Sequence, residues 1–411
     1  MKIIYLIHQF FPEFQTGTER FALNNALMAQ KFGNKVKVIT YSFYENSFYE
    51  YETHGILYKE FFFRGIPVIA FKYRKNPPNI NLVLHNNLLY GFAQTVMKIE
   101  SPDLIHVGHS MRVHEFVWVA KEMGIPYAIT LTDYFLLCPK VNLTPDKFSL
   151  CSGPKHGEAC ANLCKEFFHP YIVNRLSEAE DLLANASKII SPSRFLANIF
   201  KQEFNQLNLD IIHHGIQYKY IKQNDRLYCR DDQLIFGYAG SLIYHKGVQI
   251  LLRAFIKIKD KNVKLRIYGY GKADFVKNIE KIVENDTRVT FYGKYSAEQL
   301  GDIFESIDVL VIPSICYENY PMVLQEALVS NIPVIGTRLG VFVKKIKDGF
   351  NGFTFLPGNS DDLQKKMEQI INAPSLLNKM KENIKTKIIV PTIEQEAYEY
   401  FEIYNKMMGF S

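Results

Sequence analysis

The sequence predicts an α/β protein built from two successive domains, each with a doubly wound parallel sheet. Short apolar runs alternate with amphipathic helical stretches along the chain, a pattern typical of βαβ units. A polar stretch around residues 217–232 interrupts the alternation, which then restarts. A chain of 411 residues has room for two or three domains at about 150 residues each.

The first half begins with a predicted βαβ unit. Its parts are the strand KIIYLI, a loop around Gly17, a helix near 20–32 and the strand KVKVIT. Further strands are expected at 104–107, 127–132 and 187–193. Because parallel sheets bind ligands at the carboxyl ends of their strands, we expect site residues in the loops that follow them.

The second half repeats this pattern. Its expected strands lie in LIFGYAGSL, VKLRIYG, VTFYG, VLVIPS and PVIGT, and its expected helices over 247–258, 273–284, 296–306 and 321–330. We therefore predict two Rossmann-like domains, 1–210 and 211–391, that face a cleft, the default place for an active site. An amphipathic helix over about 392–411 is expected to pack back on the first domain.

The composition excludes several classes of protein. The chain is 47% hydrophobic and 22% charged, unlike disordered or collagen-like chains. Its net charge of +6 is spread over both halves, so nothing indicates a nucleic-acid partner. No apolar run approaches the roughly 18 residues that span a bilayer, and the opening MKIIYLIHQFFPEF lacks a signal-peptide core. We expect a cytoplasmic enzyme, with peripheral contact at the inner membrane face as an open alternative.

One segment, FFFRGIPVIAFKYRKN, concentrates cations among aromatic residues. Its basic residues are Arg64, Lys72, Arg74 and Lys75, an arrangement that could form a patch on a membrane surface. We favour the simpler alternative, a β-hairpin with a solvated basic rim.

The segment VLVIPSICYENYPMVLQEALVSNIPVIGT carries the strongest functional pattern. A predicted strand at 309–313 ends in a loop with Glu318, and a helix opens at Pro321 and carries Glu326. The free N–H groups of about residues 320–323 would form an anion site suited to a diphosphate. The two carboxylates suit hydroxyl groups instead. Phosphate donors beside hydroxyl acceptors predict a nucleotide-sugar ligand.

A second phosphate-binding element is predicted in GSLIYHKG, residues 240–247. Gly240 follows a strand and would let the backbone approach a ligand. Lys246 precedes the next helix and could neutralise a leaving diphosphate. A lysine at a helix start is usually only a solvated charge. The prediction of a phosphate-binding role for Lys246 therefore depends on the segment around Glu318.

These segments resemble the retaining GT-B glycosyltransferases of family 4. The resemblance rests first on the E-x7-E spacing of Glu318 and Glu326, followed by EALVSNIPVIGT and DGFNGFTF. Supporting segments are GSLIYHKGVQILLRAF, LRIYGYG, VTFYGK, ISPSRF, TLTDYFLLCP and the loop from Pro12 to Glu19. Together they cover nearly the whole chain.

The resemblance implies a role for each matching residue of the second domain. Glu326 would hold the ribose hydroxyls, and Lys246 would stabilise the departing diphosphate. Glu318 would hold the transferred sugar and the β-phosphate. The phosphate-binding backbone would belong to Asn319, Tyr320, Pro321 and Met322, and the wall of the base pocket to Gly269, Gly271 and Lys294.

Two departures from the family concern phosphate binding. Ser241 stands where the family commonly has Arg, so Lys246 would carry the phosphate charge with less help. Gly17-Thr18 replaces a Gly-Gly pair, and Gly17 would still let the backbone approach the phosphates.

A third departure concerns the acceptor side, where Thr132-Asp133 replaces a His-Asp pair. Asp133 stays a candidate for orienting the acceptor or the sugar. His109, after the strand LIHVGH, could supply the missing imidazole, or it could be a satisfied polar residue at a strand end.

The resemblance implies transfer from a UDP- or GDP-sugar, with retention of configuration and no required metal cofactor. The acceptor would be a glycan or a lipid-linked precursor. Two other functions stay open: a nucleotide-sugar epimerase on the same fold, and a non-catalytic partner subunit. An epimerase would need acid and base residues around the anomeric carbon, and the intact Glu318, Glu326 and Lys246 count against a non-catalytic subunit.

Four of the six cysteines fall within one Gly- and Lys-containing loop region: Cys138, Cys151, Cys160 and Cys164. Their spacing, C-x12-C-x8-C-x3-C, could close around a structural zinc ion. The alternative is a set of unrelated thiols, because a C-x3-C pair is less diagnostic than C-x2-C.

Overall fold

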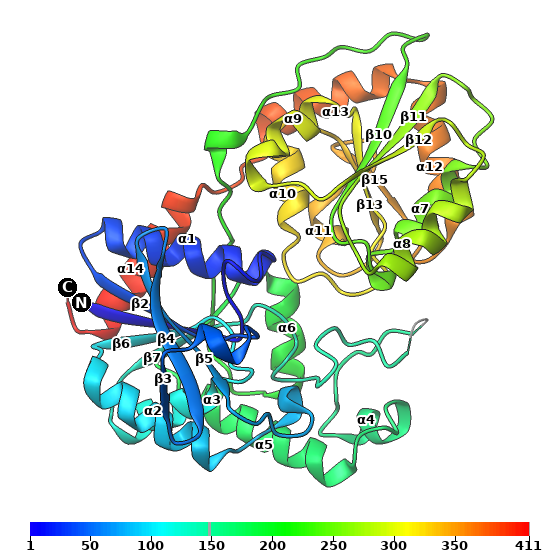
Figure 1. The fold of residues 1–411 in the computed structure, drawn as a ribbon. Helices are drawn as coiled ribbons and strands as arrows, with labels where there is room; N and C mark the ends of the chain where they lie inside the picture. The colour runs from blue at the N-terminus through cyan, green and yellow to red at the C-terminus, as the bar shows by residue number, and fades with distance from the viewer. Residues whose placement is uncertain (147–148, 411) are drawn as a thin grey trace. The chain divides into compact units, whose positions relative to one another are not determined.

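The computed structural model describes residues 1–146 and 149–410 and divides into two units (Figure 1). Unit 1 contains Met1–Pro145, Ser149–His214 and Ile393–Ser411, and most of unit 2 is Gly215–Thr392. Each unit is a sheet with helices on both faces, as the alternating pattern of the sequence predicts.

Unit 1 has a nine-stranded sheet in the order β3-β4-β5-β2-β1-β6-β7-β8-β9. After β1, the next strands in the chain, β2 to β5, lie on one side of β1 in the sheet. The later strands β6 to β9 lie on its other side, so the strand order reverses between β1 and β6. The predicted first βαβ unit is confirmed, with β1 and β2 parallel. The strands are β1 (Lys2–Ile7), β2 (Lys35–Tyr41), β3 (Tyr51–Thr53), β4 (Ile56–Phe63), β5 (Ile66–Tyr73), β6 (Leu104–Val107), β7 (Tyr127–Thr130), β8 (Lys188–Ser191) and β9 (Leu209–Ile211).

The basic aromatic segment forms the favoured hairpin. Strands β4 and β5 pair antiparallel, with Arg64 and Gly65 in the turn. Two of its cations bind within the unit, because Arg74 pairs with Glu52 and the ammonium of Lys72 donates to the carbonyl of Tyr44 at 2.9 Å. These contacts hold part of the basic rim against its own unit.

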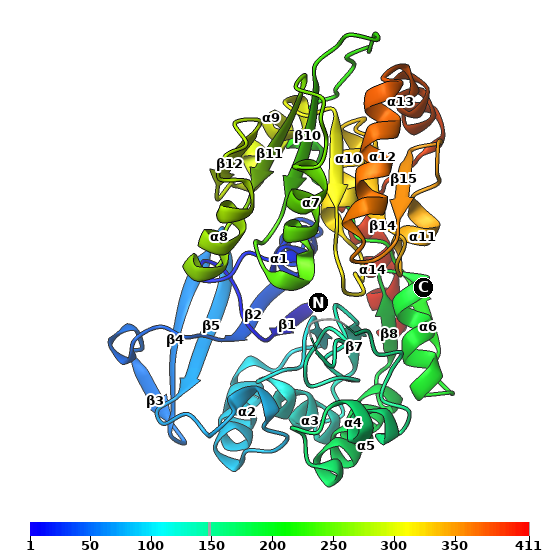
Figure 2. The ribbon, with the colours of Figure 1, turned by 90° about the vertical axis from the view of Figure 1, so that its right-hand side faces the viewer.

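Helices cover both faces of the unit 1 sheet (Figure 2). On one face, α1 and α14 pack on alternate residues of β1, and Tyr400 and Tyr404 of α14 lie in this core. On the other face, Phe71 of β5 contacts Phe92 of α2 and Phe116 of α3. The helices of this unit are α1 (Gly17–Lys31), α2 (Asn87–Glu100), α3 (His114–Glu122), α4 (Glu158–Leu163), α5 (His169–Ala184), α6 (Arg194–Glu203) and α14 (Ile393–Met407).

A buried histidine of β6 connects the sheet to α14. The Nε2 of His106 lies 3.0 Å from the hydroxyl of Thr130, and its Nδ1 is hydrogen-bonded to the hydroxyl of Tyr404. The imidazole is fully buried. This burial disfavours the charged ring and lowers the pKa of His106 to about 3.

Acid should therefore weaken unit 1 through His106. In the unfolded chain the imidazole of His106 binds a proton near pH 6.5, whereas in the folded chain its pKa is about 3. The free energy of unfolding is therefore fully present above pH 6.5 and decreases as the pH falls from 6.5 to 3. The loss amounts to roughly 5 kcal/mol at most. Urea unfolding at several acidic pH values should show a shallower pH dependence for His106→Gln. The exposed His169→Gln is the control, and an unchanged slope in His106→Gln would contradict the prediction.

Unit 2 has a six-stranded, fully parallel sheet in the order β12-β11-β10-β13-β14-β15. The chain moves from β10 to β11 and β12 on one side, then crosses to β13, β14 and β15 on the other. The strand order therefore reverses between β10 and β13. The strands are β10 (Leu234–Ala239), β11 (Val263–Tyr268), β12 (Val289–Gly293), β13 (Val309–Ile312), β14 (Val334–Thr337) and β15 (Gly352–Phe355).

Alternate residues of each unit 2 strand enter different cores. In β13, Val309 and Val311 face the helices α7, α8 and α12, whereas Leu310 and Ile312 face α9, α10 and α11. Such two-sided burial explains why these strands read as continuous apolar runs. The helices are α7 (Val248–Phe255), α8 (Ala273–Glu280), α9 (Leu300–Glu305), α10 (Met322–Val329), α11 (Phe342–Lys345), α12 (Ser360–Asn372) and α13 (Ser375–Lys387).

The predicted helices of this unit exist but are shorter than expected. The helix predicted over 273–284 ends at Glu280 and continues as a 3-10 turn over Lys281–Val283. The helix predicted over 296–306 begins with a 3-10 turn before α9. Helix ends often tighten into 3-10 turns, which apolar periodicity does not reveal.

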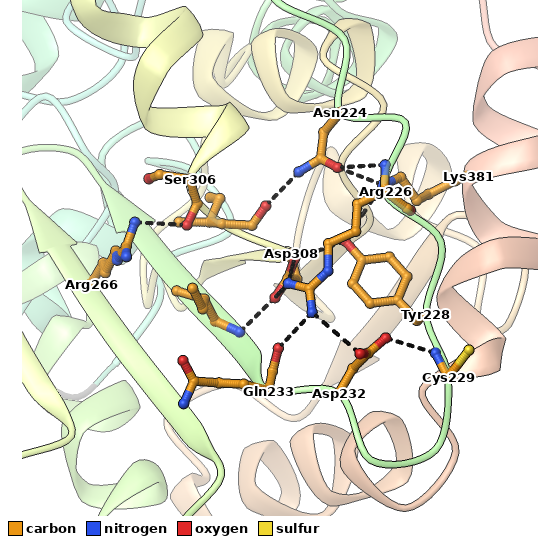
Figure 3. A network of polar contacts seen from close by, with 12 residues as sticks. Asn224, Arg226, Tyr228, Cys229, Asp232, Gln233, Arg266, Ser306, Asp308 and Lys381 are labelled. Carbon is orange, nitrogen blue, oxygen red and sulfur yellow. Dashed lines mark hydrogen bonds and ion pairs between the residues drawn. The ribbon is translucent and has the colours of Figure 1, made fainter.

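A polar network joins the segment that enters unit 2 to the amino ends of its strands (Figure 3). The buried carboxylate of Asp308 accepts hydrogen bonds from the Tyr228 hydroxyl and the Ile235 backbone, and it pairs with Arg226. The ammonium of Lys381 donates to the Asn224 side chain at 2.7 Å. Burial lowers the pKa of Lys381 to about 8. The network lies at the sheet edge opposite to the strand ends where ligands of such sheets bind, so it serves the fold.

Candidate functional site

The predicted phosphate-binding residues of unit 2 lie at the point where its strand order reverses. Lys246 follows β10 and Glu318 follows β13, and these two strands are neighbours in the sheet. Their loops therefore meet at the carboxyl edge, where open parallel sheets bind their ligands. The order of strands, which the sequence alone does not give, is what brings the two residues together.

Lys246 and Glu318 form a close ion pair. The ammonium lies 2.7 Å from Oε1 and 2.9 Å from Oε2 of the carboxylate, whose side chain is 12% exposed. The hydroxyl of Ser314 donates to Oε1 at 2.6 Å. Burial alone would raise the pKa of Glu318, but the Lys246 ammonium and the Ser314 hydroxyl hold it below its ordinary value. Both members of the pair are therefore charged at neutral pH.

Glycine residues allow the two loops to touch. A Cβ on Gly247, which has φ +74°, would lie 1.9 Å from the carbonyl oxygen of Pro313. The backbone N–H of Ile315 donates to the carbonyl of His245 at 2.9 Å. The loop after β10 is thus seated on the loop after β13, and this contact positions Lys246 beside Glu318.

The predicted turn after β11 packs on the loop after β10 in the same way. A Cβ on Gly269 would lie 1.8 Å from the carbonyl oxygen of Gly240. A Cβ on Gly271 would lie 2.0 Å from the carbonyl oxygen of Leu242. Gly240 differs, because a Cβ there would meet only the Tyr238 side chain, at an ordinary 3.5 Å. Packing within the protein therefore does not require a glycine at position 240. The predicted roles of Gly240 and Ser241 in binding the ligand stay predictions.

The predicted wall of the base pocket is aromatic. The rings of Tyr268 and Tyr292 stack with centroids 4.6 Å apart. The ammonium of Lys294 lies over the ring of Tyr270 at 5.3 Å. These side chains occupy the ends of β11 and β12, next to the glycine turn.

The start of α10 lies where the sequence placed an anion site. Pro321 caps the helix, which begins at Met322, one residue later than predicted. Asn319 and Tyr320 precede this cap in the loop after β13. The first N–H groups of a helix have no acceptor inside it. Glu326 lies within the helix and is 2% exposed.

The predicted acceptor-side residues of unit 1 meet each other. The Nε2 of His109 lies 2.7 Å from the carboxylate of Asp133, and its Nδ1 accepts the N–H of Met111 at 3.1 Å. Because Nδ1 accepts, the ring proton belongs on Nε2, which donates to Asp133. Both residues line a small pocket, partly open to solvent, at the carboxyl ends of β6 and β7, and Thr132 lines it too.

Sequence reasoning missed two neighbours of this pair. The ring of His8, which follows β1, stacks on that of His109 with centroids 3.9 Å apart. Burial, with help from the charges of His109 and Arg112, lowers the pKa of His8 far below its ordinary range. Glu19 lies 3.9 Å from His8 and closes a capping box with Thr16 at the start of α1, beside the predicted Gly17. The T-x-x-E pattern of that box was visible in the sequence.

The four cysteines of the predicted zinc site follow β7, and Cys160 lies in α4. All four cysteines are buried and unpaired by disulfides, but no group of three or more His, Cys, Asp or Glu within residues 1–146 and 149–410 is arranged to hold a metal ion. Burial raises the pKa of the Cys160 thiol to about 12. The neighbouring thiols of Cys138, Cys151 and Cys164 add to this rise, and the zinc site stays a prediction.

None of the helices in the described part of the chain combines the length and the apolar composition that a membrane crossing needs.

Comparison of the sequence with protein families finds one match in unit 2. Residues 221–387 match the model for "Glycosyl transferases group 1". This segment contains the strands β10 to β15 and both residues of the Lys246–Glu318 pair.

Curated relatives match part of the chain. An uncharacterised glycosyltransferase of Methanocaldococcus jannaschii is 29% identical over 44% of this chain and 47% of its own length. The lipopolysaccharide 1,2-N-acetylglucosaminetransferase of Salmonella typhimurium is 26% identical over 44% of this chain and 52% of its own length. The chain thus spans about half the length of these relatives.

Solved structures match nearly the whole chain in fold. The Anabaena protein HepE in complex with UDP and glucose superposes with a TM-score of 0.70 at 18% identity, covering 98% of this chain and 99% of that one. WaaG, described as a glycosyltransferase involved in lipopolysaccharide biosynthesis, gives 0.67 at 15% identity, covering 98% and 99%. The predicted GT-B fold is confirmed by these similarities.

Proposed function

We propose that this protein transfers a sugar from a nucleotide-sugar donor to a hydroxyl acceptor. Residues 221–387 match the model for group 1 glycosyl transferases, and the chain has the GT-B fold. The donor is a UDP- or GDP-hexose, and the acceptor is a glycan or a lipid-linked precursor. The reaction retains the configuration of the anomeric carbon and needs no metal ion. The protein works in the cytoplasm, with peripheral contact to the membrane.

The observation that carries the proposal is the charged pair where the unit 2 strand order reverses. Lys246 and Glu318 are both ionised and half-buried. A nucleotide sugar has a diphosphate beside a hydroxyl-rich ring, so one ligand can satisfy the ammonium and the carboxylate together. HepE, similar in fold, is described in complex with UDP and glucose.

The proposed reaction assigns each residue one task. Lys246 and the backbone around Met322 hold the diphosphate, Glu318 holds the sugar, and Glu326 holds the ribose. The bond from the anomeric carbon to the β-phosphate oxygen breaks, and the diphosphate leaves with its electron pair, stabilised by Lys246. The acceptor oxygen bonds to the same face of that carbon, and its proton passes to an oxygen of the leaving phosphate.

The acceptor side of the proposal rests on unit 1. Asp133 orients the acceptor hydroxyl or the sugar, because its carboxylate is fixed by His109 and by the backbone N–H of Phe135 at 2.8 Å. His109 supplies the imidazole that this chain lacks at Thr132. The two residues act as a pair, because each fixes the orientation of the other.

A binding and turnover screen tests the function. Thermal shifts with UDP, GDP and ADP identify the base, and the matching nucleotide sugars are then incubated with and without glycan acceptors. We expect slow release of free nucleoside diphosphate without acceptor and fast release with the right one. Interconversion of donor sugars would indicate an epimerase, and nucleotide binding without turnover over a broad panel would indicate a non-catalytic subunit.

Replacing Glu326 with alanine is expected to weaken nucleoside diphosphate binding by about 10- to 100-fold, because the ribose hydroxyls lose a charged acceptor. Calorimetric titration with the preferred nucleotide measures the effect. Glu382→Ala, at an exposed position of α13, is the control. Unchanged affinity in Glu326→Ala would remove the ribose assignment.

A further inference from the structure

The segment that precedes α5 buries cysteines in place of large apolar side chains. Over residues 131–146 and 149–168, the one regular element that the structure describes is the short helix α4. The buried residues of 149–168 are three cysteines, two glycines and Pro154, whereas Leu163 and Phe168 are 52% and 74% exposed. A fold held by apolar burial would enclose the leucine and the phenylalanine first. We therefore expect another interaction to hold this segment, as metal ions and disulfides do where an apolar core is small.

The four cysteines of the predicted zinc site are neighbours in this segment. Each is no more than 9% exposed, and the thiols of the other three interact electrostatically with Cys160. The backbone N–H of Cys164, which caps α4, donates to the carbonyl of Cys160 at 2.8 Å. Side chains four positions apart lie on one face of a helix. All four cysteines are free of disulfides, so a shared metal ion is the remaining way to join them.

Backbone N–H groups point at two of the sulfur atoms. The N–H groups of Lys140 and Leu143 donate to the sulfur of Cys138. The backbone nitrogen of Gly153 lies 3.4 Å from Sγ of Cys151 and donates to it. Hydrogen bonds of this kind stabilise negative charge on a sulfur atom that binds a metal. The loops around these two cysteines are therefore suited to thiolates.

A buried cation lies beside the cysteines. Arg175 of α5 is 4% exposed, and its Nε has no hydrogen-bond partner in the part of the chain that the structure describes. One terminal nitrogen donates to the carbonyl of Phe135, which is a neutral group. The sulfur of Cys138 is among the groups whose negative charge would favour the charged guanidinium. Four thiolates around one divalent cation carry a net negative charge, so a metal centre would offset part of the cost of burying this cation.

The cysteines must rearrange to close around a metal ion. No group of three or more His, Cys, Asp or Glu in residues 1–146 and 149–410 is arranged to hold one. The thiol of Cys151 donates instead to the carbonyl of Gly153 at 3.2 Å. A divalent cation deprotonates a thiol that coordinates it, and a thiolate cannot donate. Metal binding would therefore break this hydrogen bond and free the sulfur of Cys151 to turn toward the other three.

We infer that one structural Zn²⁺ holds the segment between β7 and α5 in place of an apolar core, and that its ligands are the sulfur atoms of Cys138, Cys151, Cys160 and Cys164. Zn²⁺ binds four thiolates in a tetrahedral arrangement. The thiol protons pass to solvent when the ion binds. The ion takes no part in the proposed transfer, and the inference does not depend on that reaction.

Metal analysis of the purified full-length protein tests the inference. The protein is expressed with added zinc, separated from loosely bound metal by gel filtration, and analysed by mass spectrometry of the elements. We expect about one zinc per chain in the wild type, and less than about a tenth of that in the double variant Cys160→Ser, Cys164→Ser. Cys229→Ser is the matched control, because Cys229 is exposed and lies in unit 2. A wild type without zinc, iron in place of zinc, or equal zinc in the double variant and the control would overturn the inference.

A measurement on the wild type keeps the test valid if the double variant fails to fold. Protein expressed with cobalt in place of zinc should show the visible absorption of tetrahedral cobalt and a thiolate-to-cobalt charge-transfer band. Absorption typical of octahedral cobalt, or absence of the charge-transfer band, would contradict ligation by the four sulfur atoms.

Removal of the zinc tests its structural role. Lys155 and Lys165 are exposed in the segment, and trypsin should cut there about tenfold faster after treatment of the wild type with a zinc chelator. Equal cleavage before and after would contradict the role. Thermal shifts with UDP and GDP report on unit 2 and should not change. If the wild type binds no nucleotide, the transferase proposal fails, while the metal analysis still decides the zinc site.

Discussion

Replacement of Glu318 by alanine is expected to lower the rate of sugar transfer by about 10²- to 10³-fold, with little change in affinity for the free nucleoside diphosphate. The carboxylate is proposed to contact the transferred sugar, which the free diphosphate lacks. Steady-state transfer with the preferred donor measures turnover, and calorimetric titration measures nucleotide affinity. Near-normal transfer by this variant would reject the sugar contact.

A matched control separates this effect from the loss of an ion pair. Lys257 and Asp361 also pair in unit 2, but the Asp361 side chain is 71% exposed against 12% for Glu318. Exposed pairs contribute little to stability, so Asp361→Ala should leave both turnover and unfolding unchanged. If the two variants lost activity equally, the effect of Glu318→Ala would lie in folding and not in the site.

Gly247→Ala is expected to destabilise unit 2 by about 3–5 kcal/mol, because the new Cβ would lie 1.9 Å from the Pro313 carbonyl oxygen. The backbone would have to separate the two loops that carry Lys246 and Glu318. Urea unfolding followed by circular dichroism measures the loss, and nucleotide affinity should fall with it.

Gly349→Ala distinguishes the close contact from backbone strain. Gly349 has φ +73°, nearly the same as the +74° of Gly247, but a Cβ there would meet no atom within 4 Å. Only the strain of a left-handed alanine remains, about 1 kcal/mol. A similar loss of stability in both variants would show that the loop contact does not matter.

The sequence predicts a strand or helix well where the apolar residues follow one clear pattern. The strand expected at 104–107 is β6, with those bounds, because a buried parallel strand reads as an unbroken apolar run. The edge strand β3 was not predicted, since it is three residues long and exposed on two of them. Strand β15 and the amphipathic helices α12 and α13 were not predicted either.

Some features of the candidate site could be predicted from the sequence and others could not. Spacing along the chain indicated Glu318 and Lys246 separately, but their contact depends on β10 lying beside β13. Ser314 was missed because only the folded loop aims its hydroxyl at Glu318. His8 was missed because its stacking on His109 joins residues about a hundred positions apart. Residue type and local order can be read from sequence, whereas these pairings arise from long-range packing.

The core of unit 1 joins both extremes of the chain. Ile3 and Tyr5 of β1 pack in one cluster with Tyr400 and Tyr404 of α14. During synthesis on a ribosome, β1 must therefore wait for about 400 further residues to emerge before its apolar surface is fully covered. Unit 2, built mainly from one continuous stretch, can complete its core earlier. We therefore expect unit 2 to complete its core before unit 1. Until α14 is made, the incomplete core of unit 1 is exposed to aggregation and to binding by chaperones.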